Sequence, residues 1–282
     1  MNRMNMQESS PVPETLEGWY LSHEVYSLDW PQWWSLGDDE RAGVCDEAVA
    51  WLQETAAVAR GDSALYSVLT QKGDLMFLHY RETIDELGAV EFSFKGTALH
   101  DMLLPSYSYL SVIEVSLYEA VAMANRKLSA RGLEAGSDEF KAAFEGEMKV
   151  QRARLEERLY RDIPPHRYIC FYPMNKRRGE TLNWYTLPLE QRRAMMRDHG
   201  RIGHKYHETV VQVIGGSVGL DDWEWGVSLH SDDPLAFKKL VYEMRFDPAS
   251  ALYAEFGPFY VGIRRSVEEL TDLLSGEAQA NA

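Results

Sequence analysis

One order of predicted elements occurs twice along the chain, and this repeat constrains the fold more than any other feature. Apolar spacing and β-rich runs predict a strand at residues 19–27, a helix at 38–59, strands at 64–69 and 75–80, a helix at 83–103 and a strand at 107–117. The same order returns between residues 167 and 263, and a closing helix is predicted at 267–274. It is the β-α-β-β-α-β pattern of ferredoxin-like units. Two such units predict an α+β fold whose sheets pack into a dimeric α+β barrel.

A charged segment separates the two predicted units. Residues 132–163 are polar and precede a proline pair, which predicts a connecting helix that ends there. We therefore expect an N-terminal ferredoxin-like unit at 14–131 and a C-terminal one at 164–282. Residues 1–13 lack the apolar core of a secretion signal, and we expect them to form a disordered tail.

The charge balance excludes some classes of partner. The chain has 29 basic and 44 acidic residues, a net charge of -15, which argues against nucleic acid or an anionic membrane surface. No stretch is long and apolar enough to span a bilayer. Cys45 and Cys170 lie far apart, match no metal-binding spacing and are expected to be buried thiols. A cytoplasmic protein is the simplest expectation.

A cationic cluster lies at the end of the strand that is predicted at residues 167–172. Side chains alternate along an extended chain, so Tyr172, Met174 and Lys176 are expected to point the same way. Arg177 and Arg178 follow directly and add positive charge. In so acidic a chain this cluster is a candidate anion site. A solvated loop with ordinary charges is the alternative, and spacing alone favours it.

His199 is the candidate metal ligand. It lies on the predicted helix at 188–206, near an apolar face that includes Met195 and Ile202. A neutral imidazole there can ligate a metal, although a hydrogen-bonded core histidine is the commoner case. The chain has no HExxH motif and no cysteine cluster, so a zinc site is not supported. A single axial histidine suits haem, because the porphyrin supplies the other four ligands.

Gln212 is the third candidate. It shares a strand face with Val210 and Ile214, where an amide is costly unless it finds a partner. A glutamine at a solvated strand edge is the alternative. Trp184 and Trp223 could line a flat ligand such as a porphyrin, but core packing explains aromatic residues equally well.

Several motifs together resemble one family. They are YPMNKRRG at 172–179, NWY at 183–185, DHGRIGHKY at 198–206, DDWEWGVSL at 221–229 and KKLVYEMRFDPASALYAEFGPFYVG at 238–262. In these stretches the chain resembles the coproheme decarboxylases of Gram-positive type, members of the chlorite dismutase superfamily. The resemblance is nearly continuous from residue 158 to residue 262 and is looser in the N-terminal half.

This resemblance implies a fold and a reaction. Family members combine two ferredoxin-like units, and only the C-terminal unit holds porphyrin. They form homopentamers, and a coproporphyrin ferrochelatase is a further expected partner. They use hydrogen peroxide to convert Fe-coproporphyrin III (coproheme) to haem b, through an intermediate with three propionates. The porphyrin is then both substrate and redox centre.

The resemblance also implies a role for individual residues. His199 matches the axial iron ligand, Tyr172 the radical-forming tyrosine, and Lys176 the lysine needed for the second decarboxylation. Gln212 matches the distal polar residue over the iron. The positions that match porphyrin or propionate contacts are Arg158, Met174, Trp184, Arg245 and Ser250.

Three other functions are weighed as alternatives. Chlorite dismutase proper has the same fold but an arginine above the iron, and Gln212 cannot supply that charge. A non-catalytic haem-binding protein would need His199 but would not need Tyr172 or Lys176. A general peroxidase would need a distal acid–base residue, a role for which an amide is poorly suited.

Overall fold

Strand pairing builds one sheet from both halves of the chain. The structure, a computed structural model, describes residues 15–276, apart from the side chains of Tyr118 and Glu119. Within this range nine strands form one sheet in the order β7-β6-β4-β1-β3-β2-β9-β5-β8. They are β1 (Thr15–Leu28), β2 (Asp62–Val68), β3 (Leu75–Arg81), β4 (Leu103–Ser116), β5 (Tyr168–Lys176), β6 (Val211–Gly216), β7 (Trp225–Ser231), β8 (Ala254–Phe256) and β9 (Tyr260–Arg265). Strand β5 also pairs with β7, so the described strands other than β8 close into a ring.

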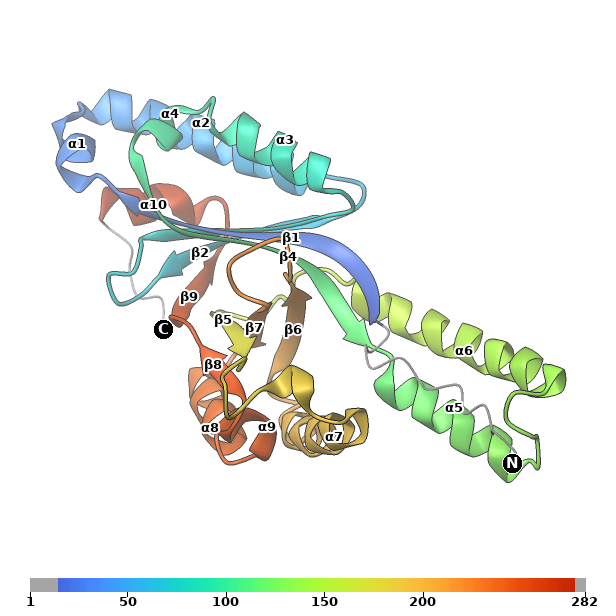
Figure 1. Cartoon of the computed structure of the whole chain (residues 1–282). Coiled ribbons are helices and arrows are strands. Elements are labelled where there is room, and N and C mark those ends of the chain that lie inside the picture. Colours follow the sequence, from blue (N-terminus) through green and yellow to red (C-terminus); the bar gives the residue numbers. More distant parts are fainter. Residues whose placement is uncertain (1–14, 277–282) are drawn as a thin grey trace.

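Helices lie on two sides of this ring (Figure 1). Those above it in Figure 1 are α1 (Trp30–Ser35), α2 (Asp38–Ala56), α3 (Ile84–Phe94), α4 (Ala98–Asp101) and α10 (Glu269–Ser275). Those below it are α7 (Leu189–Lys205), α8 (Pro234–Met244) and α9 (Pro248–Ala251). All the strand pairings are antiparallel, so this architecture confirms the predicted α+β class. Among the described residues, no helix combines the length and apolarity needed to cross a bilayer.

Strand β3 shows how the pleat divides the core. Leu75 and Phe77 face the helices, where Trp51 of α2 packs edge-on against Phe77 with ring centroids 5.7 Å apart. Met76 and Tyr80 point the other way, into the ring. Successive strand side chains alternate between faces, so a strand covered on both sides is apolar along its whole length.

The inside of the ring joins the two halves of the chain. Tyr66 from the first half packs in one cluster with Phe171 and Tyr260 from the second. His23 of β1 stacks on Phe171, with ring centroids 4.0 Å apart, and its Nε2 lies 2.8 Å from Ser228 Oγ of β7. Burial lowers the pKa of His23 to about 3, so this imidazole is neutral in the folded protein at neutral pH.

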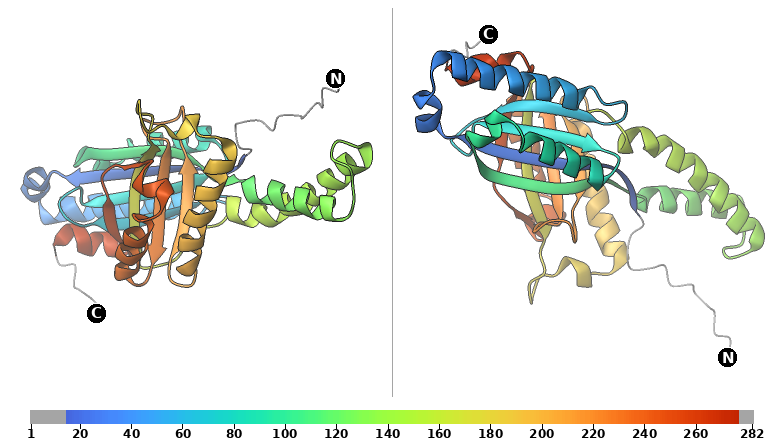
Figure 2. Two further views of the ribbon diagram at one scale, coloured as in Figure 1. Left: turned by 60° about the horizontal axis from the view of Figure 1, so that its bottom comes forward. Right: turned by 90° about the horizontal axis from the view of Figure 1, so that it is seen from above.

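Two long helices project from the sheet as a hairpin, at the right of Figure 1 and in both views of Figure 2. They are α5 (Tyr118–Ala130) and α6 (Asp138–Leu159). Helix α6 lies in the segment where a connecting helix is predicted, whereas α5 is an addition. The buried Ala124 of α5 and Met148 of α6 belong to a small cluster of their own. The tail expected at residues 1–13 lies outside the described residues.

The single helix predicted at residues 83–103 is wrong in its extent. Helix α3 ends at Phe94, and α4 begins after Thr97, whose hydroxyl accepts the backbone N–H of His100. A side-chain cap of this kind starts a new helix. Strand β4 then begins at Leu103, earlier than the predicted strand.

The buried His23 predicts a specific loss of stability in acid. Its folded pKa is about 3 and its unfolded pKa about 6.5, so the unfolded chain binds a proton first. This contribution is complete above pH 6.5 and declines as the pH falls towards 3. We expect His23→Gln to reduce the slope of the unfolding free energy against pH by about 1.4 kcal/mol per pH unit near pH 5.

Urea unfolding monitored by tryptophan fluorescence between about pH 4 and pH 7 measures this slope. The exposed His207 provides the matched control, because His207→Gln removes an imidazole without removing a buried one. A His23→Gln protein with the wild-type slope would contradict the prediction, whatever its absolute stability.

Candidate functional site

Most of the predicted site residues lie where α7 and α8 cover the second-half strands. Tyr172 comes from β5 and Gln212 from β6, while His199 lies in the middle of α7. An apolar cluster fills the space between sheet and helices, and it includes Val227 of β7 and Leu240 of α8. The arrangement follows from the strand pleat, which turns Cys170 and Tyr172 to this face and Phe171 into the ring.

His199 is held by a buried carboxylate. Its Nδ1 lies 2.9 Å from Oδ2 of Asp247, whose side chain is only 2% exposed. Ser250 donates its backbone N–H to Oδ1 and its hydroxyl to Oδ2 of the same carboxylate, both at 3.0 Å. Burial favours the neutral acid, but the hydrogen bonds from His199 and Ser250 outweigh it, so the pKa of Asp247 lies below its usual value.

An ionised Asp247 fixes the tautomer of His199. A carboxylate can only accept hydrogen bonds, so Nδ1 carries a proton, and the lone pair of a neutral imidazole is then on Nε2. A carboxylate on the far ring nitrogen is a common feature of metal-binding histidines, because it orients the ring and raises its basicity. The local sequence explains this placement. Asp247 precedes Pro248 and caps the short helix α9.

Lys176 is a buried cation next to this network. Its Nζ donates to the Ala249 carbonyl oxygen at 3.1 Å. The same Nζ lies 4.7 Å from the ring centre of Trp184, the first residue of the short helix η1 (Trp184–Thr186). Its backbone N–H donates to the buried Glu224 at 2.8 Å. Burial lowers the pKa of Lys176 to about 8, although the negative charges of Asp247 and Glu224 oppose this effect. The ammonium is therefore charged at neutral pH.

Tyr172 is a buried phenol in an aromatic setting. Phe259 stacks on it with centroids 4.4 Å apart and planes at 25°, and Phe256 lies at 5.8 Å. The guanidinium carbon of Arg245 sits 3.8 Å from the centre of the Phe256 ring. Burial raises the pKa of Tyr172, and the charge of Arg245 offsets only part of this rise. The phenol keeps its proton at neutral pH.

Gln212 approaches α7 one helical turn after His199. A Cβ added at Gly203 would lie 3.1 Å from Gln212 Nε2 and 3.3 Å from Met244 Cε. Such contacts are tighter than most side chains allow, so a larger residue here would push Gln212 away from the helix. His199 and Gly203 are four residues apart and share one helix face. The imidazole, the small residue and the amide therefore lie in one region.

Most of the predicted residues come together, and one lies apart. Met174, Trp184, Arg245 and Ser250 belong to the elements just described. Arg158 is exposed in the last turn of α6. Among the described residues, no hydrogen bond, ion pair or ring contact joins it to the others.

Sequence reasoning missed three residues that shape the site. They are Asp247, Glu224 and Phe259, which hold His199, the Lys176 backbone and Tyr172 respectively. The Asp-Pro pair at 247–248 is a helix-start signal that could have identified the first. The other two contact their partners only across paired strands, and no local pattern marks them.

Comparisons with known proteins agree with this architecture. A family model described as chlorite dismutase matches residues 41–265. A structure described as a novel heme-binding protein from Thermus thermophilus is 39% identical, with a TM-score of 0.76, and the match covers 94% of this chain and 99% of that one. A mutant chlorite dismutase from Candidatus Nitrospira defluvii is 19% identical, with a TM-score of 0.69 over 94% of this chain and 97% of that one. Because the family model spans most of the chain, the protein belongs to the chlorite dismutase family.

Proposed function

We propose that this protein binds an iron porphyrin through His199 and converts coproheme to haem b with hydrogen peroxide. Membership of the family and the 39% identity to a haem-binding protein support porphyrin binding. The burial of both Tyr172 and Lys176 on strand β5, with Lys176 next to Asp247, carries the assignment of the reaction. A haem carrier needs neither a buried phenol nor a buried ammonium in this position.

The residues present fit an iron porphyrin that would be held by His199. Asp247 occupies Nδ1 of His199, so Nε2 is the nitrogen available to iron. Gly203 leaves room for the amide of Gln212 close to α7, and we propose this amide as the polar group near the iron. When bound, the iron porphyrin supplies the redox chemistry together with peroxide.

Each decarboxylation has a simple balance. One propionic acid group and one hydrogen peroxide give one vinyl group, one carbon dioxide and two waters. Each reaction removes two electrons from the substrate side chain, one with a hydrogen atom and one as carbon dioxide leaves. The phenol of Tyr172 can relay the hydrogen atom, because it can lose an electron and a proton together and then regain both from the substrate. Lys176 supplies a positive charge and donors that can hold a propionate carboxylate. We assign carboxylate contacts to Arg158, Arg245 and Ser250, and porphyrin contacts to Met174 and Trp184.

Chlorite dismutation is the second candidate. It is supported by the family model and by the fold of the Candidatus Nitrospira defluvii enzyme. Gln212 argues against it, because a neutral amide cannot supply the positive charge expected above the iron.

A cytoplasmic homopentamer that receives coproheme from a ferrochelatase is the setting we propose for the decarboxylase.

Mass spectrometry tests the proposal directly. Iron coproporphyrin III is mixed with the purified protein, and hydrogen peroxide is added in steps. Two successive losses of one carboxyl group each, ending at haem b, are expected. If the porphyrin binds but only bleaches, the decarboxylase assignment is wrong. Chloride and dioxygen released from chlorite would instead support the second candidate.

Tyr172→Phe should separate binding from chemistry. Phenylalanine preserves the stack on Phe259 but has no phenolic proton to lose. We expect the visible spectrum of bound coproheme to be unchanged and the rate of the first decarboxylation to fall by about a hundredfold or more. The matched control is Tyr160→Phe, which removes an exposed phenol at the end of α6. A Tyr172→Phe protein that makes haem b at the wild-type rate would disprove the mechanism.

Lys176→Ala should stop the reaction halfway. The variant removes the ammonium that is proposed to hold the second propionate, while Tyr172 remains in place. We expect the three-propionate porphyrin to accumulate and haem b to form at least about tenfold more slowly. Liquid chromatography of the quenched reaction resolves the intermediate. An unchanged ratio of intermediate to haem b would argue against this role.

A further inference from the structure

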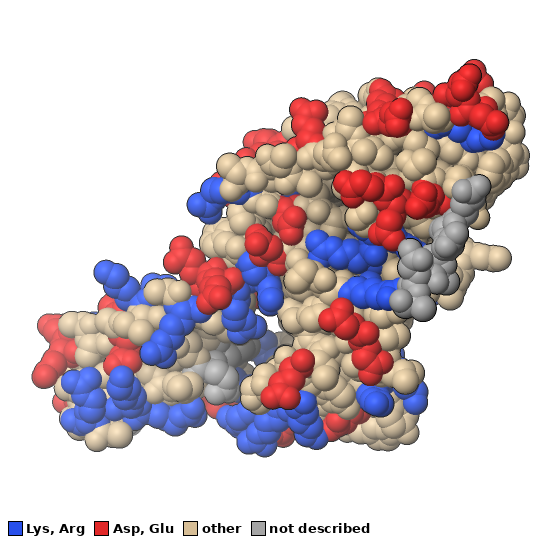
Figure 3. Space-filling view, turned by 180° about the vertical axis from the view of Figure 1, so that it is seen from behind, with Lys and Arg blue, Asp and Glu red and all other residues tan. Residues whose placement is uncertain are grey.

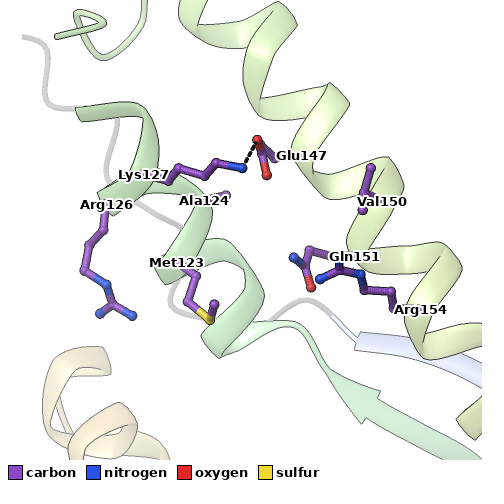
Figure 4. A pocket seen from close by; sticks show the side chains of 8 residues that line it. All are labelled: Met123, Ala124, Arg126, Lys127, Glu147, Val150, Gln151 and Arg154. Carbon is purple, nitrogen blue, oxygen red and sulfur yellow. Dashed lines mark hydrogen bonds and ion pairs between the residues drawn. The ribbon is translucent and has the colours of Figure 1, made fainter. Parts of the chain in front are cut away.

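The α5–α6 hairpin contains a groove that the proposed chemistry does not use. It encloses about 430 Å³. Figure 4 shows that the side chains lining it come from both helices. Met123 of α5 and Val150 of α6 line it and are 55% and 48% exposed. Exposed apolar side chains on a projecting hairpin indicate a surface that can bind an apolar ligand.

The same groove is positively charged. Three cations line it, Arg126 and Lys127 from α5 and Arg154 from α6, against the single carboxylate of Glu147. Glu147 pairs with Lys127 at 2.5 Å, and within the described residues Arg154 has no ion pair or hydrogen bond of its own. The whole chain has a net charge of -15, so the charge of the groove is opposite in sign to that of the chain. In Figure 3, Lys and Arg side chains gather on the hairpin and on the part of the molecule that faces it.

The charged stripe continues along α6 towards the body of the molecule. Val150, Arg154 and Arg158 are four residues apart in sequence, so they share one face of the helix. Arg158 is the position to which we assign a carboxylate contact. In both views of Figure 2 the hairpin projects on the side of the molecule where α7 lies. A ligand held in the groove therefore has a cationic path towards the helix that carries His199.

We propose that this groove is a capture site for the carboxylate-bearing porphyrin, which binds there before it reaches His199. The proposal rests on the proposed function, because it takes coproheme as the ligand. A porphyrin with four propionates is a flat apolar body with anionic arms, which matches an apolar floor with a cationic rim. In a strongly acidic protein, a local cationic surface is also what raises the association rate of an anionic ligand.

Stopped-flow mixing with iron coproporphyrin III tests the proposal through binding alone. The Soret band reports arrival at the iron ligand, and no peroxide is added. Arg154→Glu should lower the association rate constant about three- to tenfold at low ionic strength and leave the final spectrum unchanged. The matched control is Arg152→Glu, which makes the same charge change on the opposite face of α6 and should differ from wild type by less than about twofold.

Two further comparisons identify the interaction. The difference between Arg154→Glu and Arg152→Glu should vanish at about 1 M salt, where exposed charges are screened. It should also be smaller for haem b, which carries fewer carboxylates than coproheme. Circular dichroism and the melting temperature of both variants show whether the hairpin is intact.

If both variants slow association equally, the effect comes from overall charge and the capture site is overturned. The capture site is also overturned if neither variant slows association. If the wild-type protein gives no Soret change, the proposed function fails together with the capture site. If coproheme binds but later loses no carboxyl group with peroxide, the proposed chemistry fails, and the rates still decide whether the groove captures porphyrin.

Discussion

Strand β5 is hydrogen-bonded on both edges, to β7 on one side and to β9 and β8 on the other, and the rest of the structure depends on this double pairing. It closes the ring and fixes the direction of every side chain along the strand. Phe171 therefore joins the interior cluster with His23, and Tyr172 joins the cluster under α7 and α8. A shift of one residue in either register would exchange these two faces. The phenol would then point into the ring, away from His199.

The candidate site also depends on a network of largely buried charged side chains around Asp247. Asp247 accepts hydrogen bonds from His199 and Ser250, and its negative charge acts on Lys176, whose pKa it helps to keep near 8. One buried carboxylate thus influences both an imidazole and an ammonium. Removing it would leave the ammonium in a poorly solvated position with less compensation. The short helix α9 sets the geometry, because its N-cap residue Asp247 supplies the carboxylate and its residue Ala249 supplies the carbonyl oxygen that Lys176 contacts.

Much of the fold could be predicted because its signals are local. The runs at 64–69 and 75–80 become β2 and β3, and the apolar spacing at 188–206 becomes α7. Helix α5 was missed because its buried residues pack on α6, outside the main core. The candidate site residues follow from a family resemblance more than from spacing, since Tyr172, His199 and Gln212 come from three separate elements. Contacts such as that between Phe259 and Tyr172 depend on strand register, which the sequence does not specify locally.

The ring also explains why the first half persists although it supplies none of the candidate site residues. Strand β6 pairs with β4 and strand β9 pairs with β2, so each outer edge of the second-half strands is covered by a strand of the first half. If the second half were expressed alone, two of its strand edges would be unpaired. Unpaired strand edges tend to pair with other chains. The first half therefore covers both outer edges of the second-half strands. Any split or fusion of this protein therefore has to preserve both the β4–β6 and the β2–β9 pairing. Two separately expressed halves would complement each other only if both pairings formed together.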